Sequence, residues 1–149
     1  MEQKKKKTTA SPLVNSSKSI TKNVNLVKKN PQTWQIILGP SGQYDYKLVG
    51  TKLSGVFNGH GLVADTAYTL ASYKSGNNIV VLGTGMVNAR GDLHIINDPV
   101  DVGVAQEWAG DYIGQPAGYK IWLVPTGNVA GQILTWKPHE FLFETSLAR

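Results

Sequence analysis

Apolar and polar residues alternate with a period of two through most of the chain after residue 30. The run YTLASY at 68–73, for example, divides into two sets of three residues on opposite faces of an extended strand. Such alternation is typical of short β-strands with one buried face. The run IWLV at 121–124 is apolar at every position, which predicts a strand covered on both faces. The pattern predicts strands at residues 33–38, 44–49, 52–57, 67–74, 78–83, 86–90, 92–97, 119–124, 132–136 and 140–145.

Turn-forming residues separate these runs. The sequences GPSG at 39–42, KSGN at 74–77, RGD at 90–92, NDP at 97–99 and PTGN at 125–128 favour chain reversal. Helical spacing is weak, because Gly103 and Gly110 interrupt the one candidate segment, at 100–114. The sequence therefore predicts an all-β protein, an antiparallel β-sandwich of jelly-roll or immunoglobulin type with nine to ten short strands.

Charge divides the 149-residue chain unevenly. Residues 1–30 hold eight Lys and one Glu, a net charge of +7, whereas residues 31–149 sum to −2. All thirteen aromatic residues lie between Trp34 and Phe143. A basic segment without aromatics cannot bury enough apolar surface to offset the entropy lost on ordering. We therefore expect two parts, a flexible basic arm at 1–30 and a sandwich domain at 31–149.

The arm has two candidate ways to bind. Ile20, Val24 and Leu26 share one face of a potential strand, a pattern that suits an edge strand or a strand added to another subunit's sheet. The lysines can neutralise an anionic polymer such as nucleic acid or polysaccharide, without help from aromatic stacking. The predicted contact residues of the arm are Lys4, Lys5, Lys6, Lys7, Lys18, Lys22, Ile20, Val24 and Leu26.

Signals of catalysis or metal binding are weak. The chain has no Cys, its three His lack the spacing of a zinc site, and no G-x-S-x-G motif is present. Ser54, His60 and Asp65 are close in sequence, but nothing aligns them as a hydrolytic triad. We therefore predict a protein that is not an enzyme and that uses neither metal nor cofactor.

Aromatic residues offer a different kind of site. Trp108, Tyr112 and Tyr119 could stack on sugar rings if they shared an exposed face, as in a carbohydrate-binding sandwich. Four acidic residues, Glu107, Asp111, Glu140 and Glu144, stand near aromatics in the sequence. A packing role for Trp108 is the competing interpretation, since single aromatics near a surface are common.

Several motifs in the last hundred residues resemble one family of small β-sandwich domains. They are FNGHGL at 57–62, YTL at 68–70, GDLHI at 91–95, KIWLVP at 120–125, and Trp136, Pro138 and FLFE at 141–144. This uncharacterised family occurs in predicted secreted or surface proteins of archaea and bacteria. The resemblance implies the sandwich fold and an extracellular or cell-surface location, but no reaction. The chain departs from such relatives in starting with a basic arm, with no apolar secretion leader in the sequence as given.

Together these features predict a non-catalytic structural or interaction module. The favoured version is a subunit of a repetitive assembly (filament, layer or shell), in which the arm contacts a neighbouring subunit. The alternative is a binding module, for carbohydrate through the aromatics or for an anionic polymer through the lysines. No run of 18 apolar residues is present, so no membrane span is expected.

Overall fold

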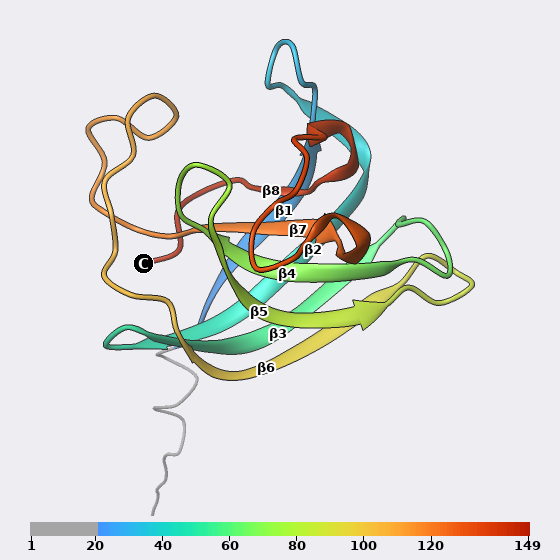
Figure 1. Cartoon of the computed structure of the whole chain (residues 1–149), viewed down its shortest axis with the longest axis horizontal. Helices are drawn as coiled ribbons and strands as arrows, with labels where there is room; N and C mark the ends of the chain where they lie inside the picture. The colour runs from blue at the N-terminus through green and yellow to red at the C-terminus, as the bar shows by residue number, and fades with distance from the viewer. Residues whose placement is uncertain (1–20) are drawn as a thin grey trace, which may run out of the picture.

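The computed structural model describes residues 21–149 and confirms the β-sandwich (Figure 1). Two antiparallel sheets face each other, one with strand order β6-β3-β2-β1-β8 and the other with order β5-β4-β7. The strands are Lys22–Lys29 (β1), Ile36–Val49 (β2), Lys52–His60 (β3), Ala67–Tyr73 (β4), Ile79–Met86 (β5), Leu93–Asp101 (β6), Lys120–Pro125 (β7) and Phe143–Glu144 (β8). Two short 3₁₀ turns, Thr126–Asn128 (η1) and Pro138–Glu140 (η2), follow β7 and precede β8.

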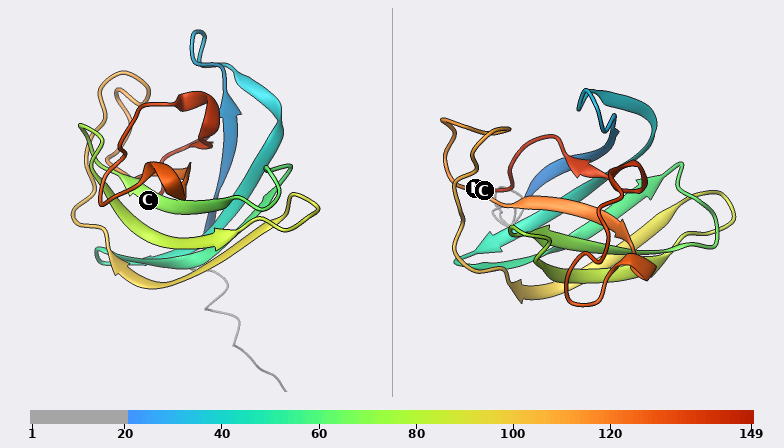
Figure 2. Two further views of the ribbon diagram at one scale, coloured as in Figure 1. Left: turned by 45° about the vertical axis from the view of Figure 1, so that its right-hand side comes forward. Right: turned by 45° about the horizontal axis from the view of Figure 1, so that its top comes forward.

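The two sheets approach each other along both sides (Figure 2). On one side β5 lies so close to β6 that a Cβ added at Gly83 would fall 2.8 Å from Cγ2 of Ile95. On the other side Leu123 of β7 and Leu142, just before β8, exchange two backbone hydrogen bonds of 3.0 Å. One lateral edge of the smaller sheet therefore lies against β6 without a strand ladder, and the other is bridged by the segment that leads into β8.

The core follows the predicted alternation in β1, β3 and β6. The single buried face predicted for the run at 68–73 is wrong, because residues 68–72 of β4, the central strand of the smaller sheet, are all buried. The continuous burial predicted for residues 121–124 is confirmed. All four of these residues are buried, because β7 is covered both by the facing sheet and by the C-terminal aromatics. Some polar groups inside the core are paired, whereas the Ser72 hydroxyl and Nε1 of Trp34 are buried without a hydrogen-bond partner among the described residues. The Tyr44 hydroxyl and Oδ1 of Asn97 are 2.7 Å apart, and Nδ2 of Asn97 donates to the Leu53 carbonyl at 3.0 Å. Such pairing removes the penalty of burying them.

The predicted boundary of the arm at residue 30 is wrong. Residues 22–29 form β1, which pairs with β2 on one side and with β8 on the other. Val24 and Leu26 are buried in the core of their own chain and so are not available to another subunit's sheet. The lysines of this strand did not prevent burial, because long Lys side chains can pack their stems while their ammonium groups find polar partners. Lys22, for example, donates from Nζ to the Arg149 carbonyl at 2.7 Å.

Five of the predicted arm lysines and Ile20 lie outside the described residues. They are Lys4, Lys5, Lys6, Lys7 and Lys18.

The predicted turn at 39–42 is a bulge. Val27 pairs with Ser41 and the next residue of β1 pairs with Ile37, so three residues of β2 lie opposite no residue of β1. Gly39 takes a φ of 132° there, and Pro40 is tolerated because a bulge does not need its N–H. The predicted strands at 33–38 and 44–49 consequently belong to one long strand.

Two other predicted strands do not form. Residues 86–90 form a turn in which Oδ1 of Asn88 accepts the N–H groups of Arg90 and Asp92, at 2.9 and 3.0 Å. Residues 132–136 form only isolated bridges in a loop that is tied by hydrogen bonds between Asn128 and Thr135. In both segments an Asn side chain competes with strand pairing for backbone groups.

Candidate functional site

The predicted ligand-binding aromatics do not form an exposed face. Tyr112 and Tyr119 are buried, and the Tyr119 hydroxyl donates to the Gly103 carbonyl at 2.6 Å. Trp108 is half-buried and donates from Nε1 to the Gly118 carbonyl at 3.1 Å. All three belong to the long connection between β6 and β7, which they hold against the sandwich. The prediction of a shared sugar-stacking surface is therefore wrong.

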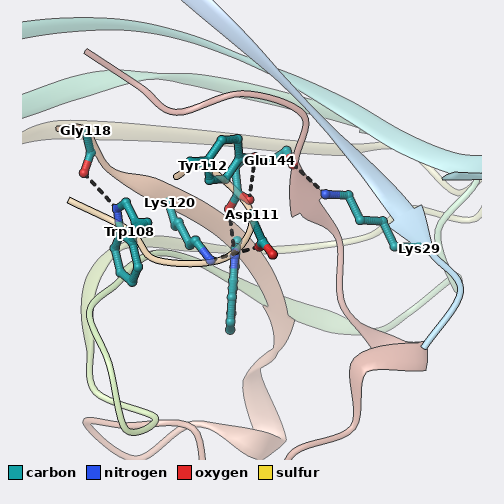
Figure 3. Close-up of polar contacts among 8 residues, drawn as sticks. Lys29, Trp108, Asp111, Tyr112, Gly118, Lys120 and Glu144 are labelled. Carbon is teal, nitrogen blue, oxygen red and sulfur yellow. Dashed lines mark hydrogen bonds and ion pairs between the residues drawn. The ribbon is translucent and has the colours of Figure 1, made fainter. Parts of the chain in front are cut away.

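A buried carboxyl group lies where this connection meets the sandwich (Figure 3). The residue is Glu144, which is 2% exposed. Its Oε2 accepts the Tyr112 hydroxyl at 3.0 Å and its Oε1 accepts Nε1 of Trp122 at 2.7 Å. Lys29 of β1 donates to the Glu144 backbone carbonyl at 3.1 Å. One residue thus joins β1, β7, β8 and the connection.

Burial dominates the electrostatics of this carboxyl. Desolvation raises the pKa of Glu144 to about 7, although the charge of Lys120 and the hydrogen bond from Tyr112 act in the opposite direction. Burial and the neighbouring carboxylate also raise the pKa of Tyr112, so its hydroxyl stays protonated as a donor.

Lys120 secures the other side of the connection. Its Nζ lies 3.1 Å from Oδ2 of Asp111, 4.7 Å from the ring centroid of Trp108 and 5.7 Å from that of Tyr112. An ammonium over aromatic faces gains cation–π attraction in addition to its ion pair. Glu144 and Lys120 therefore hold the same connection through neighbouring residues, Tyr112 and Asp111.

An aromatic cluster surrounds the carboxyl. The ring of Trp122 stacks 4.0 Å from Tyr73 and meets Phe143 edge-on at 5.0 Å, while Trp34 lies 4.7 Å from Phe143. Trp136 packs on Phe141 and Phe143 from outside. Because these rings and Tyr112 exclude solvent, the carboxyl is not presented to a substrate. Its role in the structure is to link elements.

A row of polar side chains crosses the outer face of the larger sheet, next to Ile96 of β6, which is 66% exposed on the same face. The strand register sets Asn25, Gln43, Asn58 and His94 side by side on β1, β2, β3 and β6, all exposed. The His94 Nδ1 and Asn58 Oδ1 atoms are 2.7 Å apart. The first three residues line a shallow hollow of about 550 Å³. This row supplies hydrogen-bond donors and acceptors without an aromatic platform.

One edge of the hollow brings together residues that the sequence did not align. Nδ1 of His60 lies 3.1 Å from Oδ1 of Asp92, and Ser41 is the cross-strand partner of His60. The sequence had placed His60 near Ser54 and Asp65 instead. Within the described residues the Ser41 hydroxyl makes no hydrogen bond to His60, the contact through which a serine nucleophile is activated.

The tip of the β1–β2 hairpin is an exposed apolar surface that the sequence prediction missed. The hairpin projects beyond the sandwich at the top of Figure 1. Ile36, Ile37 and Leu38 are 56%, 38% and 93% exposed. The stretch 31–44 contains no charged residue, and this feature of the sequence could have indicated the exposed apolar surface. We call Ile36, Ile37 and Leu38 the hairpin tip.

Comparisons with protein-family models, with curated protein sequences and with solved structures find no match for the chain. The resemblance to secreted or surface sandwich domains therefore stays a prediction. Across residues 21–149, no three His, Asp or Glu side chains gather as a potential metal site. The same part of the chain has no helix with the length and apolar character that crossing a bilayer requires.

Proposed function

We propose that this protein is a non-catalytic interaction subunit that associates with copies of itself, as part of an extracellular or cell-surface filament, layer or shell. The observation that carries the proposal is the hairpin tip. Three consecutive large apolar side chains stand on a projecting hairpin within an uncharged stretch of sequence. Contiguous exposed apolar surface of this kind marks interaction sites in soluble proteins.

The rest of the sandwich supports this role for the tip. One lateral edge of the smaller sheet lies against β6, the other is bridged by Leu142, and a polar row crosses the outer face of the larger sheet. The other large apolar side chains that are exposed in the described region, such as Val104 in the β6–β7 connection, are not consecutive in the sequence. Burial of the tip therefore gains the hydrophobic free energy that scattered residues do not.

Sedimentation velocity over a wide concentration range tests self-association. We expect the full chain to show a mass that rises with concentration. The variant Ile36→Lys/Leu38→Lys should remain a monomer, because it sets like charges on an apolar contact. Val104→Lys is the matched control, since Val104 is 80% exposed and lies in a different segment. A wild-type chain that is monomeric at every concentration would contradict the proposal.

A second candidate function is binding of an anionic polymer by the N-terminal lysines. Five Lys and one Glu give residues 1–20 a net charge of +4, against +1 for residues 21–149. Binding of a fluorescent single-stranded oligonucleotide should weaken log-linearly with salt. Replacing Lys4, Lys5, Lys6 and Lys7 by Gln should make the negative slope of log K against log salt shallower by about 3. A slope that the replacement leaves unchanged would exclude these lysines as the contact.

A further inference from the structure

The hairpin tip also carries an unpaired strand edge. Pairing between β2 and β3 begins at Ser41, opposite His60, where β3 ends. On the side away from β1, residues 36–40 of β2 therefore have no strand partner within residues 21–149. On the other side Ile36 and Ile37 pair with Lys29 and Lys28. Within the described residues, Ile36 and Ile37 thus have one side paired and the other free, and Leu38 has no strand partner on either side.

Natural sheets usually protect such an edge with charges, Pro, bulges or a covering segment. In this chain the protection is confined to one end. Leu38, Gly39 and Pro40 form the bulge at the end of the free edge, and a Cβ added at Gly61 would fall 3.4 Å from Cα of Pro40. Ahead of them the edge has apolar side chains and no charge. It combines unpaired backbone with apolar side chains, the two features that strand addition uses.

We propose that the hairpin tip pairs antiparallel with the hairpin tip of a second copy, across a two-fold axis near Ile37. This inference rests on the proposed self-association and names its contact. In the register that overlaps all three apolar residues, Ile37 lies opposite Ile37 of the second copy, and Ile36 lies opposite its Leu38. Because a two-fold contact requires one surface to complement itself, the absence of like charges at 31–44 favours a second copy as occupant.

The geometry limits what this contact builds. Pro40 has no N–H to donate, so the paired segment is short and depends on its side chains. Each copy has one such tip, and the pairing uses it completely. The contact therefore closes a dimer, and a larger filament, layer or shell would need a second surface.

Cysteine cross-linking tests the register, and the chain contains no native Cys to interfere. Under mild oxidation Ile37→Cys should form a covalent dimer roughly tenfold or more faster than the exposed control Val104→Cys, since pairing raises the effective concentration. An equimolar mixture of Ile36→Cys and Leu38→Cys should give the mixed dimer in excess of a statistical yield. Circular dichroism confirms that each variant is folded.

The outcomes separate this inference from the proposed function. If wild type associates but Ile37→Cys cross-links no faster than Val104→Cys, strand pairing at the tip is wrong while self-association stands. If Ile37→Cys is fast but the mixture is statistical, the antiparallel register is wrong. A monomeric wild type refutes both. If another segment of the same chain covers the hairpin tip instead, the wild type stays monomeric, and both proposals are refuted.

Discussion

Glu144 should make the stability of this fold depend on pH, and Glu144→Gln should remove that dependence. The buried carboxyl has a pKa of about 7 in the folded protein, above its ordinary value of 4.5. Between these two values the folded state binds more protons than the unfolded state. The free energy of unfolding therefore falls as pH rises through this window. The stabilisation is fully present below pH 4.5 and is lost above pH 7.

The size of the effect follows from the shift. A change from 4.5 to about 7 corresponds to about 3 kcal/mol, at about 1.4 kcal/mol for each pH unit. Glutamine has nearly the shape of a protonated glutamic acid and does not titrate. It still offers one oxygen to Tyr112 or Trp122. Relative to wild type, the variant should therefore gain up to about 3 kcal/mol of stability between pH 4.5 and pH 8.

Chemical denaturation at half-unit steps of pH measures this difference. The control is Glu107→Gln, an exposed carboxyl in the same connection, whose curve should run parallel to wild type. Subtracting the curves cancels the pH dependence that all variants share. Parallel curves for wild type and Glu144→Gln would refute the reasoning. A difference of opposite sign would mean that Lys120 and the hydrogen bonds outweigh desolvation.

Two further changes test the fold. Removing residues 2–20 should leave cooperative unfolding intact. Removing residues 2–30 also deletes β1 and should abolish the native near-ultraviolet circular dichroism. If the chain without residues 2–30 still folds, the role of β1 in the sandwich is contradicted. Gly42→Ala would put a Cβ 2.2 Å from Cζ of Phe57 and should cost about 1–3 kcal/mol in thermal denaturation. Gly127→Ala, with no atom within 4 Å of the added Cβ, should change stability by less than about 0.5 kcal/mol, and equal effects at the two sites would contradict the close packing under Gly42.

The fold class could be predicted because it depends on local patterning. Alternation located the cores of most strands, and continuous apolar character identified the doubly covered β7. The errors arose where side chains or pairing decide the outcome. Asn88 turned a predicted strand into a loop, and Gly39 with Pro40 gave a bulge instead of a reversal. Whether a Gly-Pro sequence bends or reverses a strand depends on the neighbouring strand, which the local sequence does not specify.

The Glu144 site could be predicted only in part. The sequence shows an acid beside Phe143 and other aromatics, but the contacts come from residues 22, 32 and 115 positions away. The free-energy cost of burying a carboxyl is offset only when donors such as Tyr112 and Trp122 converge on it. That convergence is a property of the folded chain. The same holds for His60, whose acidic partner is Asp92 across the sheet and not the nearby Asp65.

The boundary of the basic segment changes which partner its charge favours. Dividing the chain at residue 30 gives a body of −2, an acidic surface that a neighbour's lysines could contact. Because β1 belongs to the sandwich, the body is residues 21–149, with ten Lys and Arg against nine Asp and Glu, a net charge of +1. The net charge of the body of one copy therefore gives no overall attraction for the lysines of the next. This favours an anionic polymer as the partner of Lys4–Lys7 and leaves contacts between copies to the uncharged hairpin tip.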